Sequence, residues 1–404
     1  MNTIERPEYI SWLDRWRDKK IIKTISGVRR CGKSTILEMY RKKLLEDDVT
    51  PKQMIAINFE DLAFEDLQDY MKLYDYVQSK LVPDKMNYIF LDEIQMCGNF
   101  EKAVDSLFLK DNCDLYITGS NSRFMPGKLA TLLSGRYVMM EMLPLSFKEY
   151  ATELKGRHPD MTPTQMFTNY CRYGSFPFIL NFDGDAKDAT EYVRALYDTI
   201  ILNDVVKRGG IADVPILESI VRFLLYNVGN RTSTAKIADT LKSAGKNIDR
   251  KTVDKYVGAL VGAMLFYEAP RYNIKGRQFL TTRSKFYAVD MGFRSILASS
   301  KESDKGHVLE NVIYLELRRR GYDVFVGEDA GTEVDFVAMD NGVPSYYQVC
   351  LTALESETLK REMEPLKRIK DNFPKYLLTL DEAFANENIE GIIKTNALDW
   401  LMGV

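Results

Sequence analysis

The chain has 404 residues, of which 45% are hydrophobic and 28% are charged, and its formal net charge is −3. This composition is typical of a soluble globular protein of about two or three domains. No apolar run reaches the roughly 18 residues of a membrane span, and the first residues do not resemble a signal peptide, so we expect a cytoplasmic protein without membrane partners. The five cysteines are scattered and lack metal-ligand spacing, which predicts reduced thiols and argues against a zinc site.

Residues 21–37 form the strongest motif. After a predicted short helix at 7–17, an apolar strand runs into a loop bounded by two glycines at the spacing G-x-x-x-x-G-K-S, and a helix follows. Such a loop aims successive backbone N–H groups and a helix N-terminus at one anion, so it predicts a phosphate-binding P-loop rather than a plain glycine turn. Lys33 would hold the β- and γ-phosphates of ATP, and Ser34 would hold Mg²⁺. The expected nucleotide-binding residues are Gly27, Val28, Arg29, Arg30, Cys31, Gly32, Lys33, Ser34 and Thr35.

The next two strands end in acids. Residues 53–59 predict a buried strand followed by Glu60 and Asp61, which are either near the site or solvated turn residues. Residues 88–93 give four hydrophobic residues and then Asp92 and Glu93, the pattern of a Walker B strand. Asp92 would orient the Mg²⁺ coordination sphere, and Glu93 would polarise the attacking water. This pattern is weak alone and strong when it follows a P-loop.

Two further candidates follow along the chain. The strand at 114–118 ends in polar residues, of which Asn121 or Ser120 could sit beside the attacking water and the γ-phosphate, with a plain turn as the alternative. Arg136 begins a fifth strand. It could stabilise transition-state charge in the same chain or from a neighbouring subunit, or it could form a structural salt bridge.

The motifs together resemble those of the bacterial and archaeal AAA-type ATPases that join a P-loop domain to a C-terminal domain of unknown function. The resemblance covers nearly the whole chain and is carried by residues 27–35, 91–95, 117–122, 133–137, 143–147, 170–177 and 285–292. It implies that the family's P-loop and acidic residues correspond to Gly32, Lys33, Ser34, Asp92 and Glu93. It implies no biological role, because the family is defined by its architecture.

The middle of the chain is helical and then basic. Residues 146–213 predict a helical lid and connector. Residues 231–287 carry twelve Lys or Arg against four acids, a net charge of +8. Helices predicted at 234–244 and 249–264, followed by two strands, suggest a winged helix that binds double-stranded DNA. The alternative is a protein-interaction module with a solvated basic surface. The basic residues expected on the exposed face are Arg250, Lys251, Lys255, Lys275 and Arg277.

The last hundred residues resemble the restriction-endonuclease-like fold. A helix with Glu310, a strand with Asp335 and a second strand with Gln348 follow the order in which such enzymes hold a metal. Cys350 stands where the lysine of the E/Q-x-K tripeptide belongs. Because the ammonium that would stabilise developing negative charge is missing, the sequence predicts an inactive domain used for structure or docking. We expect Glu310 and Asp335 to lie within metal-bridging reach and Cys350 to project toward the same pocket.

The expected fold is therefore α/β, with an additional-strand, AAA-like parallel sheet. The expected domains are a P-loop ATPase domain at 1–150, a helical lid and connector at 151–214, a winged helix at 215–300 and a nuclease-like domain at 301–404. The expected function is ATP binding and Mg²⁺-dependent hydrolysis that drives a conformational or assembly switch. The alternatives are a nucleotide-controlled DNA-binding protein with slow turnover and a metal-dependent nuclease with an ATPase motor. The expected partners are ATP, double-stranded DNA, and a second copy or another protein.

Overall fold

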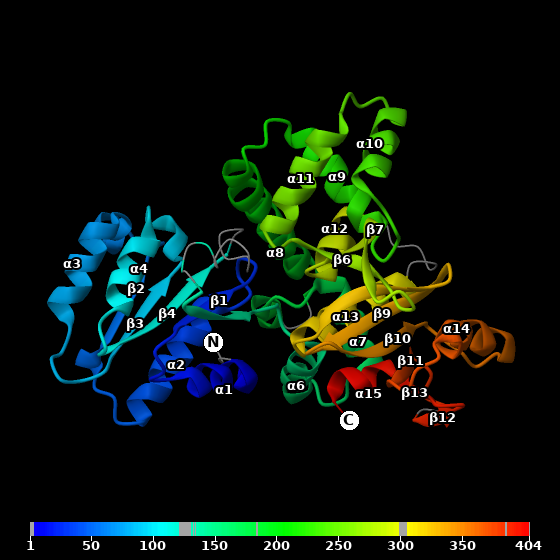
Figure 1. Ribbon diagram of the computed structural model, residues 1–404, viewed down its shortest axis with the longest axis horizontal. Coiled ribbons are helices and arrows are strands. Elements are labelled where there is room, and N and C mark those ends of the chain that lie inside the picture. The colour runs from blue at the N-terminus through cyan, green and yellow to red at the C-terminus, as the bar shows by residue number, and fades with distance from the viewer. Residues whose placement is uncertain are drawn as a thin grey trace. The chain divides into compact units, whose positions relative to one another are not determined.

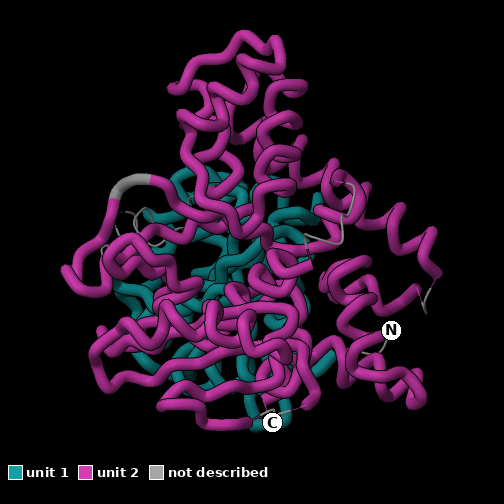
Figure 2. The backbone as a smooth tube through the Cα atoms, turned by 90° about the vertical axis from the view of Figure 1, so that its right-hand side faces the viewer, with its two compact units in different colours: residues 1–142, 262–264 teal, residues 143–261, 265–404 magenta. Residues whose placement is uncertain are grey.

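The computed structural model describes residues 4–120, 131, 133, 135–182, 185–298, 305–383 and 386–403. Contacts within the chain define two compact units (Figure 2). Unit 1 comprises Met1–Met142 and Gly262–Met264, and unit 2 comprises Leu143–Val261 and Leu265–Val404. The finer division into four domains stays a prediction.

Unit 1 is built on a five-stranded parallel sheet with the order β2-β3-β4-β1-β5 (Figure 1). The strands β1, β3 and β4 are buried along their whole length, as expected for the central strands of a parallel sheet covered on both faces. Because β4 lies between β1 and β3, the sheet has the additional-strand order, and the expected fold class is confirmed. The elements of unit 1 are α1 (Pro7–Trp16), β1 (Ile22–Ser26), α2 (Lys33–Glu46), β2 (Met54–Asn58), α3 (Tyr70–Lys80), β3 (Asn87–Asp92), α4 (Phe100–Phe108), β4 (Cys113–Gly119) and β5 (Tyr137–Glu141).

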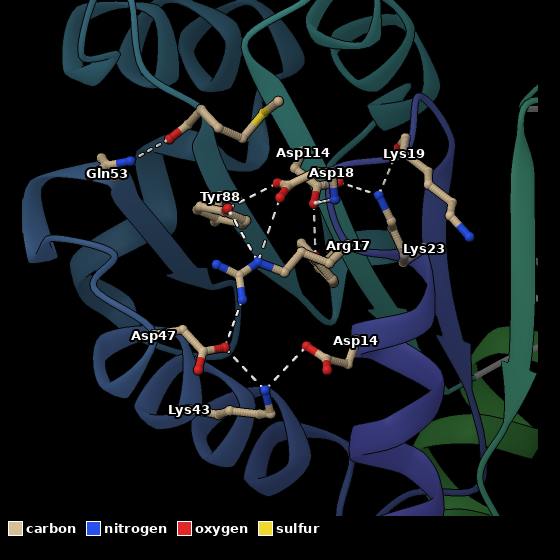
Figure 3. Close-up of polar contacts among 12 residues, drawn as sticks. Asp14, Arg17, Asp18, Lys19, Lys23, Lys43, Asp47, Gln53, Tyr88 and Asp114 are labelled. Carbon is tan, nitrogen blue, oxygen red and sulfur yellow. Dashed lines mark hydrogen bonds and ion pairs between the residues drawn. The ribbon is translucent and has the colours of Figure 1, made fainter.

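A buried charged network joins the amino ends of β1 and β4 (Figure 3). Lys23 of β1 is fully buried, and its ammonium pairs with the carboxylate of Asp114. Asp114 also accepts hydrogen bonds from the Asp18 backbone N–H at 3.0 Å and from the Tyr116 hydroxyl at 2.8 Å. Tyr88 donates to the carboxylate of Asp18 at 2.9 Å. The network therefore ties two neighbouring strands to the loop that precedes β1.

Unit 2 contains an eight-stranded mixed sheet with the order β12-β13-β11-β10-β9-β8-β6-β7. The hairpin of β6 and β7, which was expected as the wing of a winged helix, forms one edge of this sheet, because β6 pairs in parallel with β8 over Arg271–Asn273. The sheet thus continues across the boundary expected at residue 300. Its strands are β6 (Phe266–Asn273), β7 (Gln278–Ala288), β8 (Asp323–Asp329), β9 (Thr332–Asp340), β10 (Val343–Val349), β11 (Lys375–Thr379), β12 (Glu387–Ile389) and β13 (Ile392–Asn396).

Helices make up most of the rest of unit 2. The helical pattern expected over 146–213 is seen in α6, α7, α8 and the π-helical stretch Ile200–Lys207, and the two helices expected in the basic segment form as α10 and α11. Within the described ranges, none of the helices combines the length and the apolar character needed to cross a bilayer. The helices are α6 (Phe147–Arg157), α7 (Pro163–Tyr173), α8 (Ala186–Thr199), α9 (Val214–Tyr226), α10 (Thr234–Ser243), α11 (Arg250–Gly262), α12 (Met291–Leu297), α13 (Lys305–Arg319), α14 (Ser356–Arg368) and α15 (Ala397–Met402).

Two distant stretches that carry the family resemblance meet at the buried carboxylate of Asp290. It accepts hydrogen bonds from the backbone N–H and the hydroxyl of Ser175, both at 2.6 Å, and from the Gly292 backbone N–H at 2.7 Å. Gly174 has a φ of +90°, and a Cβ there would lie 2.3 Å from the Asp290 carboxylate. These contacts give the segments 170–177 and 285–292 a structural role in joining α7 to α12.

Candidate nucleotide-binding site

The P-loop is the connection between β1 and α2. Gly32 has the left-handed conformation, with φ at 110°, and α2 starts at Lys33. Gly27 is needed for space, because a Cβ there would lie 2.3 Å from the carbonyl oxygen of Met142. The buried guanidinium of Arg6 donates to the Cys31 carbonyl at 3.1 Å and braces the loop from outside. In the described residues no side chain caps α2, so its first N–H groups remain available to an anion.

Lys33 is buried beneath this loop. Its ammonium donates to the carbonyl oxygens of Gly27 at 3.0 Å and Val28 at 3.2 Å, and it lies 3.3 Å from a carboxylate oxygen of Glu93. Burial would lower the pKa of Lys33, but the neighbouring Cys31, Glu93 and Asp92 raise it above its ordinary value. The ammonium is therefore charged at neutral pH and faces the loop that would carry the phosphates.

The two acids of the Walker B strand have different surroundings. Burial raises the pKa of Asp92, although hydrogen bonds from Ser34 and Thr118 oppose it. Burial would also raise the pKa of Glu93, but Lys33 and the hydrogen bonds from Ser120 and Gln95 hold it below its ordinary value. Glu93 is thus the more readily ionised of the two, as its expected role requires.

Glu93 is fixed in place by its backbone and by its side chain. Its φ of 54° is left-handed, and its backbone N–H donates to the Thr118 hydroxyl at 2.9 Å. Its carboxylate accepts from the Ser120 hydroxyl at 2.8 Å and from the side-chain amide of Gln95. Sequence reasoning did not assign roles to Thr118 and Gln95, although both lie in stretches that carry the family resemblance. Thr118 is near the end of β4, and Gln95 follows β3.

The residues around Ser34 fit a magnesium ion shared with a nucleotide. The Ser34 side chain is exposed at the first turn of α2 and hydrogen bonds with Asp92 at the end of β3. One hydroxyl and one carboxylate are the oxygen ligands that Mg²⁺ takes when phosphates and water complete its shell. The described part of the chain has no group of three His, Cys, Asp or Glu residues suited to a metal of its own.

The other loop residues expected to bind nucleotide differ in exposure and backbone conformation. Val28 and Cys31 bury their side chains, Thr35 is exposed, and Arg30 has a positive φ of 67°. Arg29 pairs with Glu60 at 2.6 Å. Glu60 therefore belongs to the surroundings of the P-loop.

The two remaining candidates differ in what the structure says of them. Asn121 lies outside the described residues, whereas its neighbour Ser120 contacts Glu93 directly. Arg136 lies at the amino end of β5, where its carbonyl accepts from the Ile22 N–H at 2.9 Å. That is the opposite end of the parallel sheet, about 13–16 Å from the P-loop by the rise of a five-residue strand. Its guanidinium lies 3.7 Å from the Asp105 carboxylate and over the Phe108 ring, so the structure does not bring Arg136 to the P-loop of its own chain.

A second cluster of charges in unit 2 corrects one expectation. Glu310 and Asp335 do approach each other, but the ammonium of Lys285 lies between them, 2.7 Å from Glu310 and 3.6 Å from Asp335. It is also 2.7 Å from Glu333. The expectation that this site lacks a cation was therefore wrong, because β7 supplies one that the tripeptide does not.

The other residues of the nuclease-like pattern are engaged with the protein. The side-chain oxygen of Gln348 accepts from the Asp335 backbone N–H at 3.4 Å, and its amide group donates to Glu362 at 3.3 Å. The Cys350 thiol contacts the Thr352 carbonyl at 3.5 Å, and burial raises its pKa to about 12. Cys350 is therefore a protonated thiol beside the cluster rather than a reactive group.

Residues 231–287 also present less positive charge at the surface than the net charge of +8 counted from their sequence. Arg231 and Arg271 pair with Glu328, and Lys285 pairs with Glu310. Both glutamates lie outside residues 231–287. Lys255 donates to the Gly210 carbonyl at 2.6 Å. The charges left on the surface include Arg250, Lys251, Lys275 and Arg277, whose side chains are exposed.

Comparisons with known proteins agree with this architecture. A family model described as an AAA domain matches residues 19–151, and one described as a domain of unknown function (DUF8612) matches residues 164–304. An uncharacterized protein of Haemophilus influenzae is 36% identical over 400 residues, which are 99% of this chain and 98% of that protein. The uncharacterized protein MJ1544 of Methanocaldococcus jannaschii is 30% identical over 366 residues, 87% of this chain and 79% of that protein.

A solved structure shares the fold. The Walker-type ATPase PABY2304 of Pyrococcus abyssi superposes with a TM-score of 0.52 and 17% identity, over 73% of this chain and 96% of that one.

Proposed function

Because the chain belongs to the family of AAA-domain proteins that includes the H. influenzae and M. jannaschii relatives, we propose that it binds ATP with Mg²⁺ and hydrolyses it. The observation that carries this proposal is the meeting of Lys33, Glu93 and Ser120 at the carboxyl ends of β1, β3 and β4. In a parallel α/β sheet, ligands bind at this edge.

Each side chain has a separate role in the proposed reaction. Lys33 holds the terminal phosphates, and Ser34 and Asp92 hold Mg²⁺, which when bound neutralises charge on the β- and γ-phosphates. Glu93, ionised and aimed by Ser120 and Gln95, orients the attacking water and accepts its hydrogen bond. A phosphate that engages the Lys33 ammonium competes with Gly27, Val28 and Glu93 for it. ATP binding would thereby loosen Glu93, which is the proposed start of a conformational or assembly switch.

The test compares two variants by ATP affinity and by steady-state phosphate release. Lys33→Ala should abolish binding, whereas Glu93→Gln should keep binding and lose turnover by a factor of about a hundred or more, because a general base contributes on this scale. Matched controls are Lys43→Ala and Glu46→Gln, at the far end of α2. Hydrolysis by Glu93→Gln at the wild-type rate would remove Glu93 from its proposed role.

A second candidate function is binding of double-stranded DNA by the α10–α11 region, with the nucleotide in control. The observation that favours it is the exposure of Arg250, Lys251, Lys275 and Arg277. Replacing all four by alanine should weaken duplex binding uniformly across sequences and flatten its salt dependence, by about one unit of log–log slope for each lost phosphate contact. A control removes four exposed lysines of unit 1, namely Lys52, Lys72, Lys80 and Lys102. Absence of duplex binding at low salt would favour a protein-interaction module instead.

A further inference from the structure

Unit 2 contains a groove of about 440 Å³ between the β6–β7 turn and the segment that joins α14 to β11. Its floor includes Ile274, Tyr346 and Ile369, which belong to the hydrophobic core of this part of the sheet. Because the floor is packed core, the groove is part of the folded framework. None of the contacts described above uses it.

The walls of the groove are mainly cationic. Lys275 and Arg277 contribute from the β6–β7 turn, and Arg368 and Lys370 contribute from the end of α14 and just beyond it; all four side chains are exposed, and Arg368 pairs with Glu364 at 3.0 Å. Two acids, Asp329 and Asp371, also line the groove. Asp371 is already engaged by the Tyr346 hydroxyl at 2.7 Å and by the Lys375 ammonium at 3.3 Å. The groove therefore carries a net positive charge that suits an anionic ligand.

Aromatic rings stand beside these cations. Tyr272 and Phe373 line the groove and are partly exposed. Tyr272 is 5.5 Å from the ring of Phe279, which is 61% exposed, and Phe279 is 5.0 Å from Phe325. A row of accessible rings next to basic side chains is the arrangement on which unpaired bases stack while their phosphates are neutralised.

We propose that this groove binds a nucleotide unit of a single-stranded nucleic acid, with the phosphates on Lys275, Arg277 and Lys370 and a base against Tyr272 or Phe373. The proposal does not depend on ATP hydrolysis. It differs from the duplex proposal, with which it shares Lys275 and Arg277, because Lys370 and Phe373 line the groove and lie outside residues 231–287. A free mononucleotide has the same chemistry as one unit of a strand, so both are tested.

The experiment measures fluorescence anisotropy of a labelled oligothymidylate of about 12 nucleotides, within the size range of strand-binding grooves. The full chain is used with Lys33→Ala, so that the P-loop does not take up free nucleotide. Lys275→Ala with Lys370→Ala should weaken binding about tenfold or more at low salt. The matched control, Lys360→Ala with Arg361→Ala, removes two exposed charges of α14 that do not line the groove, and it should change binding by less than about twofold.

A ring variant separates stacking from simple charge attraction. Phe373→Leu keeps an apolar side chain but removes the ring, and it should weaken oligothymidylate binding about fivefold or more. Melting temperatures of all variants identify any that fail to fold. Competition by thymidine monophosphate as strong as by the oligonucleotide would identify a free nucleotide as the ligand. Equal competition by polyglutamate, absence of binding, or equal loss in the α14 control would overturn the proposal.

Discussion

Glu93 shows how single residues shape the candidate site. Its carboxylate is held by an ammonium, a hydroxyl and a side-chain amide, from Lys33, Ser120 and Gln95. A base must be aimed as well as ionised, since proton transfer and water orientation depend on geometry within hydrogen-bond reach. The amide of Gln95 is therefore a positioning group whose effect should appear in turnover rather than in affinity.

Removal of that amide is the first prediction. Gln95→Ala should lower kcat by about tenfold and leave ATP affinity within about twofold, because the interaction matters mainly when Glu93 orients water. Steady-state phosphate release measures kcat, and equilibrium binding of a labelled ATP analogue measures the affinity. Gln78→Ala on the exposed face of α3 is the control. An equal loss of affinity and turnover would show that Gln95 supports the loop as a whole.

Asp335 gives a prediction about pH. Burial is the main cause that raises its pKa from 3.8 to about 7, with Glu310 adding to it and Lys285 opposing it. Between these two values the folded chain binds more protons than the unfolded chain, so the free energy of unfolding falls as the pH rises. His307 acts in the same direction, because Glu310 raises the pKa of its imidazole and the stability it adds at low pH is lost as the pH rises.

Asp335→Asn should consequently flatten the fall of unfolding free energy from pH 4 to pH 7. Urea unfolding at a series of pH values measures the slope, and Asp239→Asn on the exposed face of α10 is the control. A slope unchanged by Asp335→Asn would contradict the assignment.

At the scale of secondary-structure elements, β1 and β4 are held together by more than apolar packing. Burial lowers the pKa of Lys23, while Asp114 stabilises its charged form. An ion pair in such a place is weak evidence of net stability, but removal of one partner leaves the other buried and uncompensated. The network in Figure 3 should therefore behave as a unit.

A double-mutant cycle on this pair is the next prediction. Lys23→Met should cost about 3–5 kcal/mol, because Asp114 then keeps an unpaired buried charge. Lys23→Met combined with Asp114→Asn should cost less than Lys23→Met alone. Urea unfolding, followed by a signal from unit 1 such as Trp16 fluorescence, measures these two variants and Asp114→Asn alone. A double variant as unstable as the sum of the single variants would show that the two side chains act independently.

The hairpin of β6 and β7 shows how an element acquires its role from its neighbours. Lys285 and Tyr287 are two residues apart on β7 and so face the same side of the sheet. Both reach Glu310 of α13, with the Tyr287 hydroxyl donating at 2.6 Å. The strand thus forms one wall of the cluster with Asp335.

For the whole molecule, this cluster predicts that the full chain does not cut DNA. The ammonium of Lys285 already pairs with the carboxylates of Glu310, Asp335 and Glu333, so a divalent ion must displace it before it can bind. Incubation of supercoiled plasmid with the protein and Mg²⁺ or Mn²⁺ should leave the plasmid intact. Robust metal-dependent cleavage that disappears in Asp335→Ala would make this cluster an active nuclease site.

The nucleotide site could be predicted from the sequence because its parts are local. Loop spacing around Gly27 and Gly32, and a run of buried residues before Asp92, specify a strand, a turn and a helix without reference to distant residues. The order of β4 between β1 and β3 follows the same family pattern. The sequence therefore predicted the loop that holds Lys33 and the strand end that holds Glu93, but not the contact between them or the contacts of Glu93 with Gln95 and Thr118.

The rest was decided by tertiary structure, because charged side chains take their partners from neighbours in space. Lys285 supplies the cation that the sequence around Cys350 lacks. Arg231 and Arg271 form ion pairs with Glu328, so a count of basic residues along the chain overstates the positive charge at the surface. Arg136 begins a strand, as expected, yet the direction of that strand places it at the end of the sheet away from the P-loop. Sequence spacing determines which backbone turn forms, whereas the neutralisation of a buried charge depends on which strands become adjacent when the sheet assembles.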